Sequence, residues 1–213
     1  MKKIIVFLLA LLFMTPSVLI AKDNNKDLAK VLKKERAQKI KELKKGNWEL
    51  FGSSRTLDVA LAIHYDKLNT LGDNAYEIVG VASNFKSKNV GKQMATNNAC
   101  LTYAQLAGSS IKGNTVSDIY ANATDGSGEF DHFYAAYERA VAKDIRNEMN
   151  ESFSLIRQLS DGSYEMQVFY IINEDAASKM RQKAMEDAAK ETDLAQDYAE
   201  KIAQYVRNAP ERQ

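Results

Sequence analysis

The sequence predicts an α+β domain with a sheet of roughly five strands, mixed or antiparallel, and helices packed mainly on one face. Three observations support this: the apolar run at residues 76–83, the helical periodicity on both sides of it, and a hairpin signal at Asp161-Gly162. The expected order is strand, helix, strand, helix, strand, helix, hairpin, helix. A basic helix precedes this domain.

The first 21 residues have the layout of a secretory signal peptide. Lys2 and Lys3 form a positive segment, residues 4–14 are apolar, and Ala21 precedes a polar sequence. The apolar part is too short for a transmembrane helix, which takes about 20 continuous apolar residues. Leu19 departs from the small residue favoured three positions before cleavage, so an uncleaved anchor is the alternative. We expect a Sec-type signal peptide and export to the periplasm or cell envelope.

Residues 22–46 form a basic block with ten Lys or Arg and four Asp or Glu. Its composition favours a helix, and Gly46 is a plausible end. One interpretation is a helix that binds an anionic membrane surface or an envelope protein partner. The other is a solvated arm docked in part on the domain, as charge runs more often are. Residues 47–213 carry a net charge of −7, which argues against nucleic acid.

The domain begins with a short apolar strand at residues 48–51, and Ser54 is a candidate N-cap for the next helix. That helix has apolar spacings of 4, 3, 4 and 3, and His64 lies within the stripe. The stripe consists of Leu57, Leu61, His64, Leu68 and Leu71. His64 is either a ligand-binding or titrating group or a hydrogen-bonded core histidine, and the second interpretation is favoured because no other metal-ligating group shares its face.

The strand at residues 76–83 is apolar on both faces, which predicts an interior position in the sheet. Gly80 within it indicates a bulge or a close packing partner. A helix follows and ends at Gly108, with an expected buried stripe formed by Val90, Met94, Leu101, Ala104 and Ala107. Asn97 and Asn98 lie beside this stripe, where they either line a pocket or, more commonly, face water.

Residues 115–124 are expected to form a loosely alternating strand after a turn at Gly113-Asn114. The oxygen-rich segment 125–131 does not fit a calcium loop, because Phe130 and Ala136 occupy the positions that need Gly and Glu. An aromatic stripe then predicts a core-facing helix. Its members are Phe130, Phe133, Tyr134, Tyr137, Val141 and Ile145.

A hairpin is predicted over residues 152–170, with Asp161-Gly162 as a two-residue turn. In the register that this turn sets, Phe153 faces Tyr170, Leu155 faces Val168, Arg157 faces Met166 and Leu159 faces Tyr164. One long alanine-faced helix over residues 174–206 follows. It completes a single domain at residues 47–208, and residues 209–213 form a tail.

No catalytic constellation is recognisable in the chain. CxxC, HExxH, GxSxG, GxxxxGK and GxGxxG are all absent, and Cys100, the only cysteine, fits a small buried residue. We therefore expect a non-catalytic binding or structural module with no cofactor and no metal. The alternative is an exported protein that binds a small molecule or peptide in a pocket near His64, Asn97 and Asn98; an exported hydrolase ranks last. Oligomeric state is not predicted.

Three segments resemble the LPP20-like envelope lipoprotein domain, a likeness that covers about residues 48–206. They are the strand YEIVGVAS, the helix GKQMATNNACLTYAQLAG and the strand YEMQVFY. The chain departs from that family because it lacks the lipid-attachment cysteine, so membrane tethering is not implied. The resemblance implies a non-enzymatic, envelope-associated module and assigns no functional residue.

Overall fold

The computed structural model describes residues 25–118, 127–192 and 196–207. The expected signal peptide, residues 119–124 of an expected strand and the tail lie outside these residues. The fold is α+β, as predicted, but the described sheet has four antiparallel strands instead of about five. Its order is β1 (Glu49–Leu50), β3 (Met149–Gln158), β4 (Tyr164–Asn173) and β2 (Ala75–Phe85).

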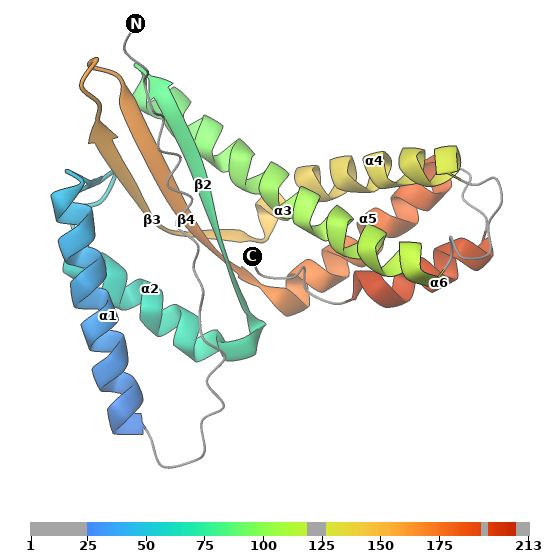
Figure 1. The fold of residues 1–213 in the computed structure, drawn as a ribbon, viewed down its shortest axis with the longest axis horizontal. Helices are drawn as coiled ribbons and strands as arrows, with labels where there is room; N and C mark the ends of the chain where they lie inside the picture. Colours follow the sequence, from blue (N-terminus) through green and yellow to red (C-terminus); the bar gives the residue numbers. More distant parts are fainter. Residues whose placement is uncertain (1–24, 119–126, 193–195, 208–213) are drawn as a thin grey trace, which may run out of the picture.

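Helices cover both faces of this sheet (Figure 1). On one face lie α1 (Asn25–Lys45) and α2 (Leu57–Leu71). On the other face lies α3 (Lys88–Asp118), with α4 (Ser127–Asp144), α5 (Glu174–Glu191) and α6 (Gln196–Val206) packed behind it. The prediction that helices pack mainly on one face therefore missed a second, smaller layer.

Among the described strands β2 lies at the edge of the sheet, which contradicts the predicted interior position. Its residues alternate between the two layers: Tyr76, Ile78 and Ala82 belong to the core under α3, whereas Val79 packs toward α2. An edge strand with a helix layer on each face has the same apolar composition as an interior strand. Gly80 marks the point where β2 and α3 approach each other closely, because a Cβ on residue 80 would lie 1.9 Å from the carbonyl oxygen of Ala95 in α3.

α3 is longer than predicted and buries only part of the predicted stripe. It continues through Gly108 and Gly113 to Asp118, so residues 115–118 are helical and not part of a strand. Ala104 and Ala107 are buried as predicted, whereas Val90, Met94 and Leu101 are exposed. The other buried apolar residues of α3 are mostly small: Ala95, Ala99, Cys100, Tyr103 and Ile111. Small side chains allow the helix to lie close to β2, so the larger apolar residues of the predicted stripe are not the buried ones.

The β3–β4 hairpin turns where predicted, but its register differs by one residue. Phe153 faces Phe169, Leu155 faces Gln167 and Arg157 faces Glu165. The backbone N–H of Leu159 donates to the Ser163 carbonyl at 2.8 Å, which leaves three residues in the loop, and Gly162 adopts a φ of 82°. A three-residue loop needs one left-handed residue, whereas the predicted type I′ turn needs two.

The aromatic stripe of α4 is buried as predicted, with every member at most 5% exposed.

The single helix predicted over residues 174–206 is two helices in the structure. The first, α5, ends at Glu191, and the hydroxyl of Thr192, the next residue, donates to the Ala188 carbonyl at 2.8 Å. Arg181 joins α5 to α6: its Nε donates to the Val206 carbonyl at 3.1 Å, and it also contacts Glu174 and Tyr103. Burial raises the pKa of the Tyr103 hydroxyl, so it stays neutral beside this guanidinium.

Candidate functional site

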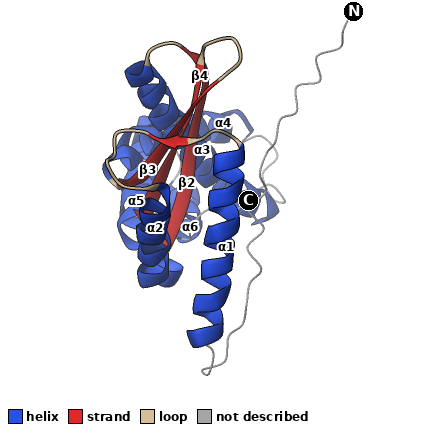
Figure 2. Ribbon diagram, turned by 90° about the vertical axis from the view of Figure 1, so that its left-hand side faces the viewer, coloured by secondary structure: helices blue, strands red, loops and turns tan. Residues whose placement is uncertain are grey.

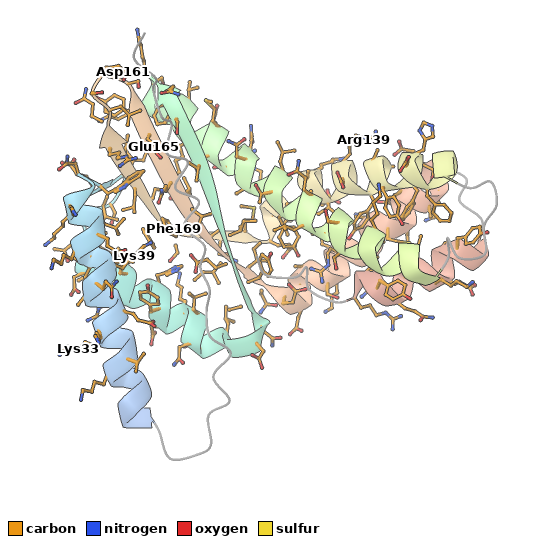
Figure 3. The ribbon with its side chains drawn as sticks, in the orientation of Figure 1. Lys33, Lys39, Arg139, Asp161, Glu165 and Phe169 are labelled. Carbon is orange, nitrogen blue, oxygen red and sulfur yellow. The ribbon has the colours of Figure 1, made fainter. Side chains whose placement is uncertain are left out.

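Six lysines of α1 form a basic face along one side of the helix. Their spacings of three, four, seven and eight residues place them on one side of the helix. All are exposed: Lys30, Lys33, Lys34, Lys41, Lys44 and Lys45. Figure 3 shows Lys33 projecting outward from this side. Within the described part of the chain, none of these six lysines forms an ion pair.

A neighbouring side of α1 holds the helix on the domain. Leu43 is buried and Ile40 partly buried against α2 and the sheet, and Arg36 pairs with Asp58 of α2 at 3.4 Å. The first half of α1 extends past the end of the sheet (Figure 2). The helix therefore has one docked side and one basic side. Because its apolar side is docked on the domain, the basic side can bind an anionic surface by electrostatic attraction.

A local motif fixes the end of α1. Asn47 adopts a φ of 56°, its N–H donates to the Lys44 carbonyl at 3.2 Å, and the Trp48 N–H donates to the Leu43 carbonyl at 3.0 Å. These two bonds and the contact between Trp48 and Leu43 constitute a Schellman motif. Asn47 is the left-handed residue, whereas the sequence indicated Gly46 as the stop. The motif sets the direction in which the basic face points.

His64 is a buried residue of α2, 3% exposed, between two strand residues. Its Nδ1 lies 3.0 Å from the Ser152 hydroxyl of β3, and its Nε2 lies 3.4 Å from a carboxylate oxygen of Glu77 on β2. The pairing of β3 with β4 shifts between Glu151 and Phe153, and this bulge contains Ser152. His64 is therefore a hydrogen-bonded core histidine. Its partners come from two strands and not from its own helix.

The His64 cluster has the composition of a Ser–His–Glu arrangement, in which an imidazole can accept the proton of a serine hydroxyl. The space around the ring is filled by aromatic side chains. The ring centroids of Tyr65, Phe153 and Phe169 lie 5.7, 5.2 and 6.1 Å from that of His64, each in an edge-on orientation. In this packed environment the imidazole connects α2 to β3 through Ser152 and to β2 through Glu77.

Asn97 and Asn98 lie on α3, across the sheet from His64, and both are exposed. Nδ2 of Asn98 donates to the Val81 carbonyl on β2 at 2.7 Å, and Oδ1 of Asn97 accepts from Arg146 at 3.4 Å. The structure therefore does not bring these two residues into one pocket with His64.

A polar hollow of about 340 Å³ lies between α3 and the β3 and β4 strands. It is lined by Lys92, Gln93, Thr96, Arg146, Met149, Glu151 and Tyr170. Nζ of Lys92 lies 2.9 Å from both carboxylate oxygens of Glu151, and the hydroxyls of Thr96 and Tyr170 are 2.7 Å apart. No local sequence pattern indicates this hollow, because its lining residues come from segments far apart in the chain.

Within the described ranges, no group of three or more His, Cys, Asp or Glu residues could hold a metal ion, and no helix is long and apolar enough to cross a membrane. Cys100 is buried, and its Sγ lies 3.6 Å from Met149 Sδ. Burial raises the pKa of its thiol, which disfavours the reactive thiolate.

No family model, curated protein or solved structure matches this chain. The resemblance to the LPP20-like domain stays a prediction.

Proposed function

We propose that the protein is a non-catalytic module of the cell envelope that attaches to an anionic surface through the basic face of α1. One observation carries this proposal: six exposed lysines lie on one side of the helix, whereas another side is docked on the domain. The signal-peptide layout of residues 1–21 supports the envelope location.

Charge separation gives the attachment an orientation. Residues 22–46 have a net charge of +6 and residues 47–213 a net charge of −7. An anionic membrane attracts the first and repels the second, so α1 lies against the surface and the acidic domain points away. Each basic residue near such a surface contributes about 1 kcal/mol, and salt screens this attraction.

Vesicle co-sedimentation of the chain from residue 22 onward tests the proposal. The vesicles contain either phosphatidylglycerol mixed with phosphatidylcholine or phosphatidylcholine alone. We expect binding to the anionic vesicles that weakens as salt is added. The triple variant Lys34→Gln, Lys41→Gln and Lys45→Gln loses about 3 kcal/mol, which is roughly a 100-fold drop in partitioning.

The matched control removes three exposed lysines from the other side of the molecule: Lys143→Gln, Lys183→Gln and Lys190→Gln. It changes net charge by the same amount, and Gln and Lys have similar helix propensities. We expect this control to bind as wild type does. Equal loss in both variants would show a net-charge effect and reject the basic face as the binding site.

Small-molecule binding is a second candidate function, and the polar hollow beside Arg146 favours it. The hollow of about 340 Å³ is within the usual size range of ligand sites. The charges of Lys92, Arg146 and Glu151 sum to +1, which suits a small carboxylate or phosphate. Thermal-shift screening with such anions tests this idea. A stabilisation by ligand that survives Arg146→Gln would exclude the hollow as the site.

A further inference from the structure

The outer side of α3 carries no charge over most of its length. Residues 93–111 contain no Asp, Glu, Lys or Arg, in a chain in which 27% of residues are charged. Eight of these residues are exposed: Gln93, Met94, Asn97, Asn98, Leu101, Thr102, Gln105 and Ser109. The solvent side of a surface helix normally carries charged residues, and their depletion is characteristic of the core of a protein interface.

Exposed apolar side chains are concentrated on the same helix. Six large apolar residues are exposed in the described part of the chain, and three of them lie on α3. They are Val90, Met94 and Leu101, with exposures of 49%, 41% and 52%. Val90, Met94 and Leu101 are four and seven residues apart, which places them on one side of the helix.

This side of α3 is continuous with the edge of the sheet. Val81 and Leu101 both line a hollow of about 380 Å³ between β2 and α3. β2 is the last strand of the described sheet on that side, and the Val81 carbonyl accepts a hydrogen bond from Asn98 of α3. We call these eight exposed α3 residues the uncharged face.

We propose that the uncharged face is a self-association surface and that its occupant is the same face of a second copy of the chain. In a two-fold symmetric interface both copies contribute the same surface, so residue i of one copy contacts residue j of the other, and a patch with a net charge would meet a patch of the same charge. The uncharged face avoids this repulsion. Its Asn and Gln amides are both donors and acceptors, so they can pair with their own copies.

The size of the face predicts a weak dimer. Nineteen helical residues span about 28 Å, and a helix with its flanking strand is about 15 Å wide, which gives roughly 400 Å² per partner. The two partners together would bury about 800 Å², which is less than the roughly 1,200 to 2,000 Å² of a stable specific interface and is in the range of weak, transient association. The inference does not rest on the proposed membrane attachment, since α1 lies across the sheet from α3 and stays accessible in such a dimer (Figure 1).

Sedimentation velocity of the chain from residue 22 onward, from about 10 µM to about 500 µM, tests the proposal. We expect the average mass of wild type to rise toward that of a dimer. Met94→Glu combined with Leu101→Glu brings carboxylates from both copies into one interface and raises the dimer dissociation constant at least about 30-fold. Both positions are exposed and Glu suits a helix, so the variant keeps its fold, which circular dichroism verifies.

Val59→Glu is the matched control, because Val59 is 43% exposed on α2, outside the uncharged face. It should associate as wild type does. Hydrogen exchange at both ends of the concentration range should show added protection in residues 93–105 of wild type only at high concentration. A wild type that stays monomeric, or a double variant that associates like wild type, would overturn the proposal. Protection confined to another surface would overturn it as well.

Discussion

Arg157 and Glu165 lie opposite each other on β3 and β4, and Nε and Nη2 of Arg157 donate to the same Glu165 oxygen at 2.8 and 2.6 Å. The Arg157 guanidinium also lies over the Trp48 ring, 4.6 Å from its centroid. This ion pair exists only in the observed register, because the predicted register placed Met166 opposite Arg157. Through the contact of Arg157 with Trp48, the ion pair also connects the β3–β4 hairpin to the segment that follows α1.

A double-mutant cycle with Arg157→Met and Glu165→Gln should measure the coupling between these residues. We expect about 1 kcal/mol, because the two side chains are 34% and 16% exposed and a charged hydrogen bond is only partly screened there. The Arg139–Glu191 pair, 66% and 60% exposed, is the comparison and should give less than about 0.5 kcal/mol. Equal couplings in urea denaturation would contradict this.

Gly80→Ala should destabilise the fold by more than about 3 kcal/mol. Its Cβ would lie 1.9 Å from the Ala95 carbonyl oxygen, and relief requires α3 to move off the sheet. Gly113→Ala, in the same helix layer but with no atom within 4 Å of the new Cβ, should stabilise by about 1 kcal/mol. Thermal unfolding of the two variants measures these opposite signs. A tolerated Gly80→Ala would refute the close approach of β2 and α3.

His64→Ala should lower the free energy of unfolding by about 2 to 4 kcal/mol. It removes packing against Phe153 and Phe169 and leaves Ser152 without its partner. Ser152→Ala should cost about 1 kcal/mol. Urea denaturation checks both values, and vesicle binding of the folded variants should equal that of wild type. A stable His64→Ala protein with altered binding would assign the histidine a functional role instead.

Arg181→Met should destabilise the protein by about 3 to 5 kcal/mol, because it leaves the Glu174 carboxylate and the Val206 carbonyl buried without their cation. The exposed Arg207 provides the control, since Arg207→Met should change stability by less than about 0.5 kcal/mol. Urea denaturation compares the two. A difference below about 1 kcal/mol would show that this network does not hold α6 in place.

Ser163→Ala should reveal a pH-dependent contribution at the hairpin tip (Figure 3). Asp161 accepts hydrogen bonds from the Ser163 hydroxyl and N–H, and these bonds lower its pKa. Stability from a lowered carboxyl pKa is present above the unfolded pKa and is lost as pH falls through the folded pKa. The variant should therefore melt below wild type at about pH 7, and the difference should shrink toward about pH 2. A difference independent of pH would contradict this.

Local patterns were sufficient for several features. The stripe from Phe130 to Ile145 is buried as its spacing predicts, and the hairpin turns at Asp161-Gly162. The basic face of α1 follows from helical spacing alone, so it too could be found in the sequence. Each of these depends on residues that are neighbours in the chain.

The candidate site was less predictable. His64 acquires Glu77 and Ser152 from two separate strands, and 88 residues separate it from Ser152. Asn97 and Asn98 are surface residues on the far side of the sheet. No local spacing indicates such distant partners, since the strand pairing and the bulge that bring them together are long-range events.

The sequence by itself determined the α+β class, the position of the hairpin turn and the aromatic side of α4, because periodicity and turn chemistry act between near neighbours. The tertiary structure alone decided the hairpin register, the edge position of β2 and which side of α3 is buried. The reason is the second helix layer. With α1 and α2 on one face of the sheet and α3 on the other, both faces of each long strand are apolar, and alternation no longer distinguishes inside from outside.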